Sequence, residues 1–131
     1  MLIDRAIFET EHVTVGVFRC PTTHPDFRDT GPTERHLVVF PRTGVWIRHA
    51  GSRAFIADSR VVTIYNAGQV YTREPMHPEG DRSDWFGLSP AMAREVARSV
   101  STAGFDDQRP FRFEFAESDA WLYCRQRMLF D

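Results

Sequence analysis

Two alternating runs in the second half of the chain combine side chains that can bind a small molecule. Tyr71 and Arg73 are two positions apart in one run, and Ser83 and Trp85 are two positions apart in the next. Residues two apart on a strand share a face, so each pair points the same way. A planar guanidinium suits a carboxylate or phosphate, and the other three supply apolar walls with polar groups. We predict that they line one ligand pocket, with Arg73 binding an anionic group.

A third run adds Trp46 and Arg48, which also share a face. Tyr65 and Arg42 are peripheral candidates. A filled core is an alternative interpretation, in which the aromatic rings pack against one another and the guanidinium of Arg73 lies in solvent. A register shift of one residue would turn every pair to the opposite face, so the sequence leaves both interpretations open.

Metal binding is not favoured by the spacing of the potential ligands. No two histidines are two apart, so the chain has no His-x-His pair of potential metal ligands; the histidines are His12, His24, His36, His49 and His77. Cys20 and His24 have a Cys-x3-His spacing that suits two ligands of a structural ion, but a closed zinc site needs about four. We predict no metal and no cofactor, and a buried Cys20 thiol beside a loop histidine.

Nucleophilic catalysis lacks a motif as well. There is no Gly-x-Ser-x-Gly turn, neither cysteine has a base next to it in sequence, and no glycine-rich phosphate loop is present. The aspartates lie mainly at turns, where they are expected for backbone reasons. We therefore predict no catalytic residue and no enzymatic activity.

Charge and length narrow the class of protein further. The 131 residues are enough for one domain with a core, and the formal net charge is −2. Every basic residue is an arginine, and the arginines are scattered rather than gathered in a stripe, which disfavours DNA binding by this chain alone. The N-terminus has no charged leader followed by a long apolar region, so we expect a cytoplasmic location and no membrane partner.

The elements that must position these side chains are short strands. Turn signals recur every eight to twelve residues or so, which is typical of an all-β sandwich or barrel. The runs that alternate or are rich in β-branched residues predict eight strands: Ile3–Phe8, His12–Cys20, His36–Pro41, Gly44–Ala50, Arg53–Ala57, Val61–Asn66, Val70–Glu74 and Arg82–Leu88. A long polar loop, Pro21–Arg35, is expected to cover one mouth of the fold.

The last third of the chain changes period. Ser89-Pro90 predicts the start of a helix that ends at Gly104. Phe111, Phe113 and Phe115 alternate with charged residues and predict a strand. A second helix is expected from Ser118-Asp119 onward, with no stop signal before the end, so we expect the chain to be a piece of a longer polypeptide. A short native tail folded back on the sheet is the alternative.

The apolar residues of these helices exceed what two short helices need for packing on a barrel. They are Val96, Val100, Trp121, Leu122, Met128 and Leu129. They either face a second subunit or cover the side of the barrel, and the sequence does not decide between the two.

The region from about Leu37 to Pro90 resembles the sensor domain of AraC-family transcriptional regulators. The resemblance rests on the order of several short motifs: Phe40-Pro41-Arg42-Thr43-Gly44, Arg48-His49 with Gly51, Phe55–Asp58, Asn66-Ala67-Gly68 followed by Tyr71, Gly80-Asp81-Arg82, Trp85, and Leu88-Ser89-Pro90. The ending Gln126–Phe130 is similar to the helix that leads into the DNA-binding half of that family.

This resemblance implies a mainly β fold: a cupin-like double-stranded β-helix barrel of jelly-roll type in residues 1–88, with two C-terminal helices and one strand in residues 89–131. It implies an effector-sensing and dimerising domain that contacts DNA only through a helix-turn-helix half absent from this chain. The expected partners are a small-molecule effector, with an anionic one favoured by Arg73, and a second copy of the chain. One alternative is a free-standing small cupin enzyme, either dependent on a metal or not. The other is a dimerisation module with a filled barrel.

Overall fold

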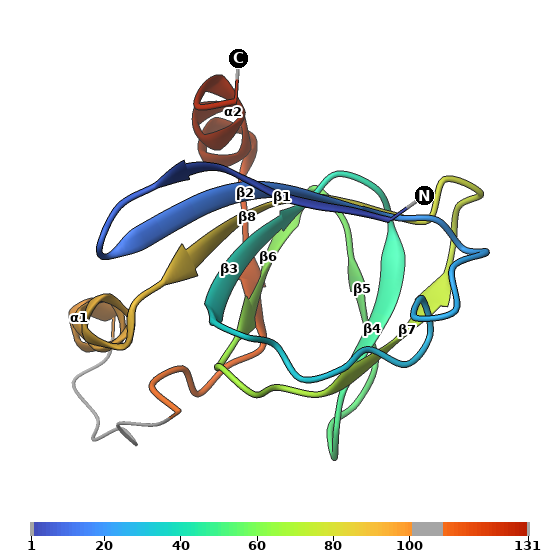
Figure 1. The fold of residues 1–131 in the computed structure, drawn as a ribbon, viewed down its shortest axis with the longest axis horizontal. Coiled ribbons are helices and arrows are strands. Elements are labelled where there is room, and N and C mark those ends of the chain that lie inside the picture. Colours follow the sequence, from blue (N-terminus) through green and yellow to red (C-terminus); the bar gives the residue numbers. More distant parts are fainter. Residues whose placement is uncertain (1, 101–108, 131) are drawn as a thin grey trace.

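Eight runs in the first two-thirds of the chain form strands, each within two residues of its predicted bounds. The computed structural model describes residues 2–100 and 109–130, and the strands enclose a barrel (Figure 1). Their bounds are β1 (Ile3–Glu9), β2 (Val13–Cys20), β3 (His36–Pro41), β4 (Val45–His49), β5 (Phe55–Ala57), β6 (Val61–Tyr65), β7 (Tyr71–Pro75) and β8 (Asp81–Leu88).

The strands form two antiparallel sheets that face one another. The larger has the order β1-β2-β8-β3-β6-β9, in which β9 (Phe115–Glu117) is an edge strand paired with β6. The smaller has the order β5-β4-β7. The long loop over residues 21–35 runs beside β7, where the Thr30 N–H donates to the Tyr71 carbonyl and the Arg73 N–H donates to the Arg28 carbonyl. The loop thus extends the smaller sheet and lines the mouth of the barrel, as predicted.

β8 lies in the middle of the larger sheet, between β2 and β3. Its odd-numbered residues Asp81, Ser83 and Trp85 face the interior of the barrel. Its even-numbered residues Asp84 and Phe86 face outward, toward the helices. The two faces of this strand therefore belong to two different environments.

The first helix, α1 (Pro90–Val100), begins where Ser89-Pro90 predicts it. The Ser89 hydroxyl accepts a hydrogen bond from the Met92 N–H at 3.1 Å, which satisfies one of the free amides of the first turn. Ala93 and Ala97 are buried against the outer face of the larger sheet, in a core that includes Val62. The predicted end at Gly104 lies outside the described residues.

The strand predicted over Phe111–Phe115 is wrong in its position: regular pairing begins at Phe115 and runs to Glu117. The side-chain amide of Asn66 causes the difference, because it donates to the Phe111 carbonyl at 2.8 Å and accepts from the Phe111 N–H at 2.9 Å. A side chain thus takes the place of a neighbouring strand, and the alternation of phenylalanines does not reveal it.

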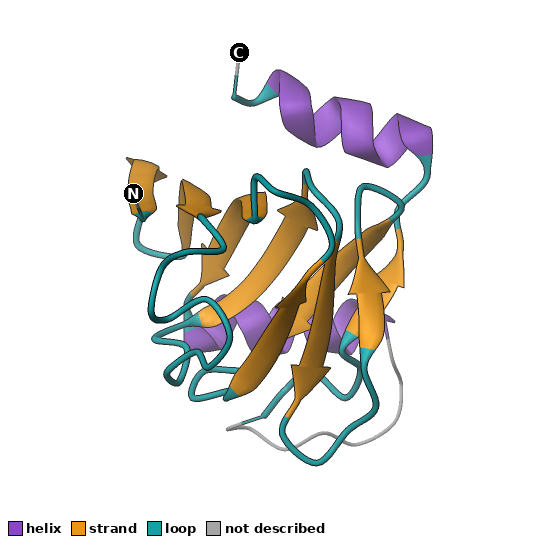
Figure 2. Cartoon of the chain, turned by 90° about the vertical axis from the view of Figure 1, so that its right-hand side faces the viewer, coloured by secondary structure: helices purple, strands orange, loops and turns teal. Residues whose placement is uncertain are grey.

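The second helix, α2 (Ala120–Met128), starts at the predicted cap: the Asp119 carboxylate accepts from the Leu122 N–H at 2.8 Å. Figure 2 shows α2 above the strands and α1 lower, behind them, so the two helices lie apart. Its apolar residues Trp121 and Met128 remain exposed. No helix in the described part of the chain is long and apolar enough to cross a membrane.

Candidate ligand-binding cavity

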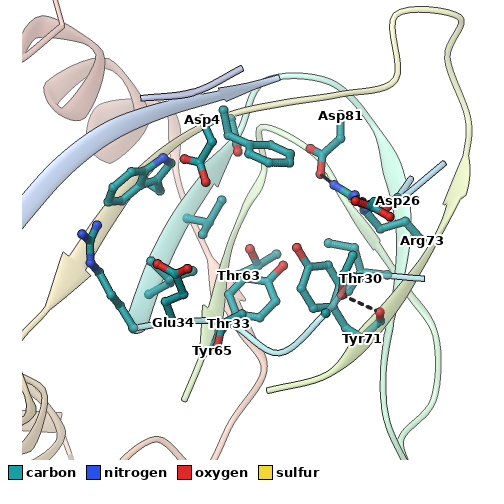
Figure 3. Close-up of a pocket in the computed structure, with 18 of the residues that line it drawn as sticks. Asp4, Asp26, Thr30, Thr33, Glu34, Thr63, Tyr65, Tyr71, Arg73 and Asp81 are labelled. Atoms are coloured by element: carbon teal, nitrogen blue, oxygen red, sulfur yellow. Dashed lines mark hydrogen bonds and ion pairs between the residues drawn. The ribbon is translucent and has the colours of Figure 1, made fainter. Parts of the chain in front are cut away.

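A cavity of about 590 Å³ occupies the barrel between the two sheets and opens to solvent beside the loop over residues 21–35. Its volume lies within the range of small-molecule sites, about 300–1,000 Å³. Polar or aromatic side chains from β6, β7 and β8 form its inner wall: the buried Thr63, Tyr65, Ser83 and Trp85, and the partly buried Tyr71. Figure 3 shows Thr63, Tyr65 and Tyr71 grouped on one side of this space.

The two tyrosines present neutral hydroxyls to the cavity. Their rings lie 4.9 Å apart, and His49 stacks on Tyr65 with ring centroids 5.0 Å apart. Burial raises the pKa of Tyr71 to about 12 and raises the pKa of Tyr65 well above its usual range. Both phenols therefore stay protonated near neutral pH and can donate or accept a hydrogen bond.

Two buried groups on the cavity wall have unused hydrogen-bonding capacity. Thr63 is completely buried and Trp85 is 7% exposed, yet neither the Thr63 Oγ1 nor the Trp85 Nε1 has a hydrogen-bond partner among the described residues. A buried polar atom without a partner costs about 1–3 kcal/mol. Both atoms are shielded from the cavity in this structure, because Thr63 lies beside Tyr65 and the Trp85 indole N–H lies near the Asp4 carboxyl.

The position of Trp85 depends on a glycine in the neighbouring strand. Gly16 of β2 pairs directly with Trp85 of β8, and a Cβ atom at Gly16 would lie 2.2 Å from the indole carbon Cζ2. The absent side chain makes room for the ring, which then stands against the cavity wall. Arg35 covers the same ring, with its guanidinium carbon 5.4 Å from the ring centroid.

Arg73 lines the cavity, as predicted, but its guanidinium is engaged by the protein. It donates to the Asp81 carboxylate at 2.7 Å and to the Phe27 and Asp26 carbonyls at 2.7 and 3.0 Å. A weaker contact reaches the Cys20 Sγ at 3.6 Å. The side chain is almost fully buried and ties the loop over residues 21–35 to β8. These partners occupy the donors that the sequence analysis assigned to an anionic ligand.

Burial dominates the ionisation of the two acidic groups closest to this wall. It raises the pKa of Asp81, although the guanidinium of Arg73 acts in the opposite direction. Asp4 of β1 turns its carboxyl into the cavity (Figure 3), and burial likewise raises the pKa of that group. The Trp85 indole N–H is near enough to lower this pKa in part, without the geometry of a full hydrogen bond.

Trp46 and Arg48 are not part of the cavity, so this part of the predicted site is wrong. They occupy the outward positions of β4, whose inward positions are Val45, Ile47 and His49. Alternation divides these five residues into two faces without saying which face is inward. The prediction took the face of Trp46 and Arg48 as inward, whereas the face of Val45, Ile47 and His49 is the buried one. Of the two peripheral candidates, Tyr65 lines the cavity and Arg42 does not.

Several lining residues were missed by the sequence analysis. Asp81 shares its parity with Ser83 and Trp85, so the same alternation that identified the pair also predicts its position. Thr63 and Tyr65 are likewise two apart on β6. The position of Asp4 could not be predicted in this way, because β1 is placed beside the cavity only by its pairing with β2.

Cys20 and His24, the alternative pair of metal ligands, both contact protein groups. The buried Cys20 thiol faces Arg73, and burial raises the pKa of this thiol. The His24 Nδ1 accepts a hydrogen bond from the Asp26 N–H at 3.1 Å. Within residues 2–100 and 109–130, no three His, Cys, Asp or Glu side chains are grouped to hold a metal ion.

A second hollow lies on the outer face of the larger sheet, between α1 and α2. It has a volume of about 650 Å³ and is lined almost entirely by apolar side chains, among them Phe86, Val96, Leu122 and Leu129. The Gln126 side chain is 4% exposed there, and neither its nitrogen nor its oxygen has a partner among the described residues. We call this hollow the outer groove.

Comparison with known proteins supports the architecture. No family model and no curated protein sequence matches the chain. The fold is similar to the crystal structure, at 1.70 Å resolution, of an RmlC-like cupin family protein with a double-stranded β-helix fold from Methanocaldococcus jannaschii. The TM-score is 0.52 and the identity 5%, over 67% of this chain and 80% of that chain. The predicted cupin double-stranded β-helix with two C-terminal helices is therefore confirmed.

Proposed function

We propose that this chain is the effector-sensing and dimerisation domain of an AraC-type transcriptional regulator. The observation that carries the proposal is the barrel cavity, whose wall holds the neutral hydroxyls of Tyr65 and Tyr71. Such a wall suits reversible binding of a polar small molecule. The order of motifs from Leu37 to Pro90 and the cupin fold support the assignment to a regulator.

The strand β8 supports the sensing role, because it connects the cavity to α2. Ser83 and Trp85 line the cavity, while Asp84 between them accepts from the Arg127 guanidinium of α2 at 2.9 Å. A shift of β8 on ligand binding would act on this ion pair and hence on the helix. Coupling of this kind requires that the ligand binds one position of the helix better than another.

In this proposal the chain performs no catalysis and acts in the cytoplasm. It forms a homodimer through exposed apolar residues of α2 and its C-cap: Trp121, Met128 and Leu129, which are 66%, 68% and 66% exposed. DNA is contacted only by a helix-turn-helix half outside this chain. Reading the coding sequence after Asp131 tests that part: a continuation without helix-turn-helix sequence would contradict the regulatory assignment.

Native mass spectrometry tests sensing and dimerisation together. We expect the mass of two chains plus a small non-covalent adduct that is lost under denaturing conditions. Trp85→Phe should lose the adduct, while Trp46→Phe, the same change on the outer face of β4, should retain it. Leu129→Glu should give monomers, and Val70→Glu, an equal change at an exposed site outside α2, should not. A bare monomer from the unaltered chain would contradict both roles.

A further inference from the structure

The side chains around the barrel cavity carry more negative than positive charge. Four carboxylates line it, Asp4, Asp26, Glu34 and Asp81, against the two guanidinium groups of Arg35 and Arg73. Asp81 and Arg73 neutralise one another through a 2.7 Å ion pair in the buried part of the wall. The charge that an incoming molecule meets is therefore set by the other three carboxylates and one arginine.

These remaining charges lie at the mouth of the cavity, on exposed residues of β1 and of the loop over residues 21–35. Asp4 and Glu34 both turn their carboxyls toward the cavity (Figure 3). Asp4, Asp26 and Glu34 form no ion pair within the part of the chain that the structure describes, although Arg35 attracts the Asp4 carboxylate. An anionic ligand would be repelled here, and the guanidinium of Arg73 is already hydrogen-bonded to Asp81, Phe27 and Asp26.

The interior beyond the mouth is aromatic and neutral. Trp85, Tyr65 and Tyr71 supply ring surfaces, and the neutral hydroxyls of Tyr65 and Tyr71 can bind a neutral oxygen. The face of Trp85 already attracts one cation, since the Arg35 guanidinium lies over it at 5.4 Å. Aromatic faces next to carboxylates are the surroundings that favour organic ammonium groups.

We infer that the cavity binds a small organic cation, a primary amine joined to a ring that carries a neutral hydroxyl, with the ammonium at the carboxylate-lined mouth and the hydroxyl at Tyr65 and Tyr71. This inference rests on the proposed function, because it names the chemical class of the effector. It replaces the anionic effector expected from Arg73. The Asp4 carboxyl gains a counter-ion when the amine binds, which favours its ionised form.

Isothermal titration with three probes of equal shape tests the charge requirement. Tyramine, tyrosol and 4-hydroxyphenylacetate share a phenol and a two-carbon chain or its acid counterpart, and differ in ending as an ammonium, a hydroxyl or a carboxylate. We expect tyramine to bind at least about tenfold more tightly than 4-hydroxyphenylacetate, with tyrosol between them, and the ratio to shrink at high salt. Equal affinity for tyramine and tyrosol, tighter binding of the carboxylate, or no binding of any probe would each overturn the inference.

Matched variants locate the effect. In the double variant Asp4→Asn with Glu34→Gln, the preference for tyramine over tyrosol should fall to about twofold or less, while the affinity for tyrosol stays near its original value. Glu11→Gln makes the same chemical change at an exposed position of the β1–β2 turn that lines neither hollow, and the preference should be retained. An unchanged preference in the double variant would contradict the assignment to these carboxylates.

Failure of this inference is distinguishable from failure of the proposed function. If native mass spectrometry shows an adduct but the probes rank in another order, the chain still senses a small molecule of a different charge class. If neither an adduct nor probe binding is found, the sensing function itself is contradicted.

Discussion

The strand β8 buries two aspartates three positions apart, and the protein compensates their charges in different ways. Asp81 faces the barrel and pairs with Arg73, which also donates to two carbonyls of the loop over residues 21–35. Asp84 faces the helices and is fully buried, but only its Oδ2 accepts from Arg127, and its Oδ1 has no partner among the described residues. The Asp81–Arg73 pair belongs to a network of hydrogen bonds that includes the loop, whereas the Asp84–Arg127 pair is a single ion pair between β8 and α2.

The difference teaches where the molecule is rigid and where it can respond. Breaking the inner pair would release a loop and leave a buried charge in the barrel wall. Breaking the outer pair would release α2, much of whose apolar surface is exposed already. We therefore assign the inner ion pair to holding the barrel together, and the outer one to attaching α2 to the outer face of the larger sheet.

The largest expected effect is that of Arg73→Leu. Removal of one partner of a buried ion pair costs about 3–5 kcal/mol in the free energy of unfolding, because the other charge remains buried. Urea denaturation measures the loss, and Arg73→Leu combined with Asp81→Leu should recover most of it. A single variant as stable as the original chain would contradict the structural role of Arg73.

Arg127→Leu should have a smaller effect, about 1–3 kcal/mol, since Asp84 loses its charged partner but lies beside a helix that can move to admit water. Urea denaturation again gives the free energy of unfolding. Increased hydrogen exchange confined to α2 would support the assignment of a releasable helix, and exchange spread over the barrel strands would contradict it. Arg125→Leu, on the same helix and without an ion pair to β8 in the described residues, is the matched control.

Thr63→Val should stabilise the ligand-free barrel by up to about 1 kcal/mol, because a buried hydroxyl without a partner is replaced by a methyl group of similar size. Thermal unfolding measures the effect. A loss of stability would show that the hydroxyl is satisfied in the ligand-free protein.

The smallest effect concerns pH and compares two buried histidines, His36 on the helix side of the sheet and His49 on the barrel side. Burial lowers the pKa of both below 6.5. The unfolded chain therefore takes up protons near pH 6 that the folded chain does not, so the free energy of unfolding should fall as the pH decreases from 7.5 to 6. Thermal unfolding at the two values measures it.

Matched variants separate the contributions to this pH dependence. The His36 Nδ1 accepts from the Ala67 N–H at 2.9 Å, an arrangement that requires the neutral ring. His36→Gln keeps an acceptor without a titration and should weaken the dependence. His77→Gln removes an exposed ring and should leave it as it is. Equal slopes in all three proteins would contradict a role for His36.

Strand positions were predictable from sequence because alternation and turn residues are local signals. The cavity pairs Tyr71 with Arg73 and Ser83 with Trp85 followed from the same parity. The hydrogen bonds that occupy the Arg73 guanidinium could not be predicted from this parity. Their acceptors include the backbone carbonyls of Phe27 and Asp26, whose positions depend on how a loop folds over β7. Trp46 and Arg48 were misplaced because parity alone does not state which face is inward.

The alternation along β8 has a consequence for folding fidelity. Asp81, Ser83 and Trp85 point one way and Arg82, Asp84 and Phe86 the other, so a slip of one residue against β2 would exchange the two sets. The indole of Trp85 would then lose the space left by Gly16, and both aspartates would lose their arginines at once. A misregistered pairing of this central strand therefore loses the packing of Trp85 and both ion pairs at the same time. Fewer strand pairings are then compatible with a closed barrel.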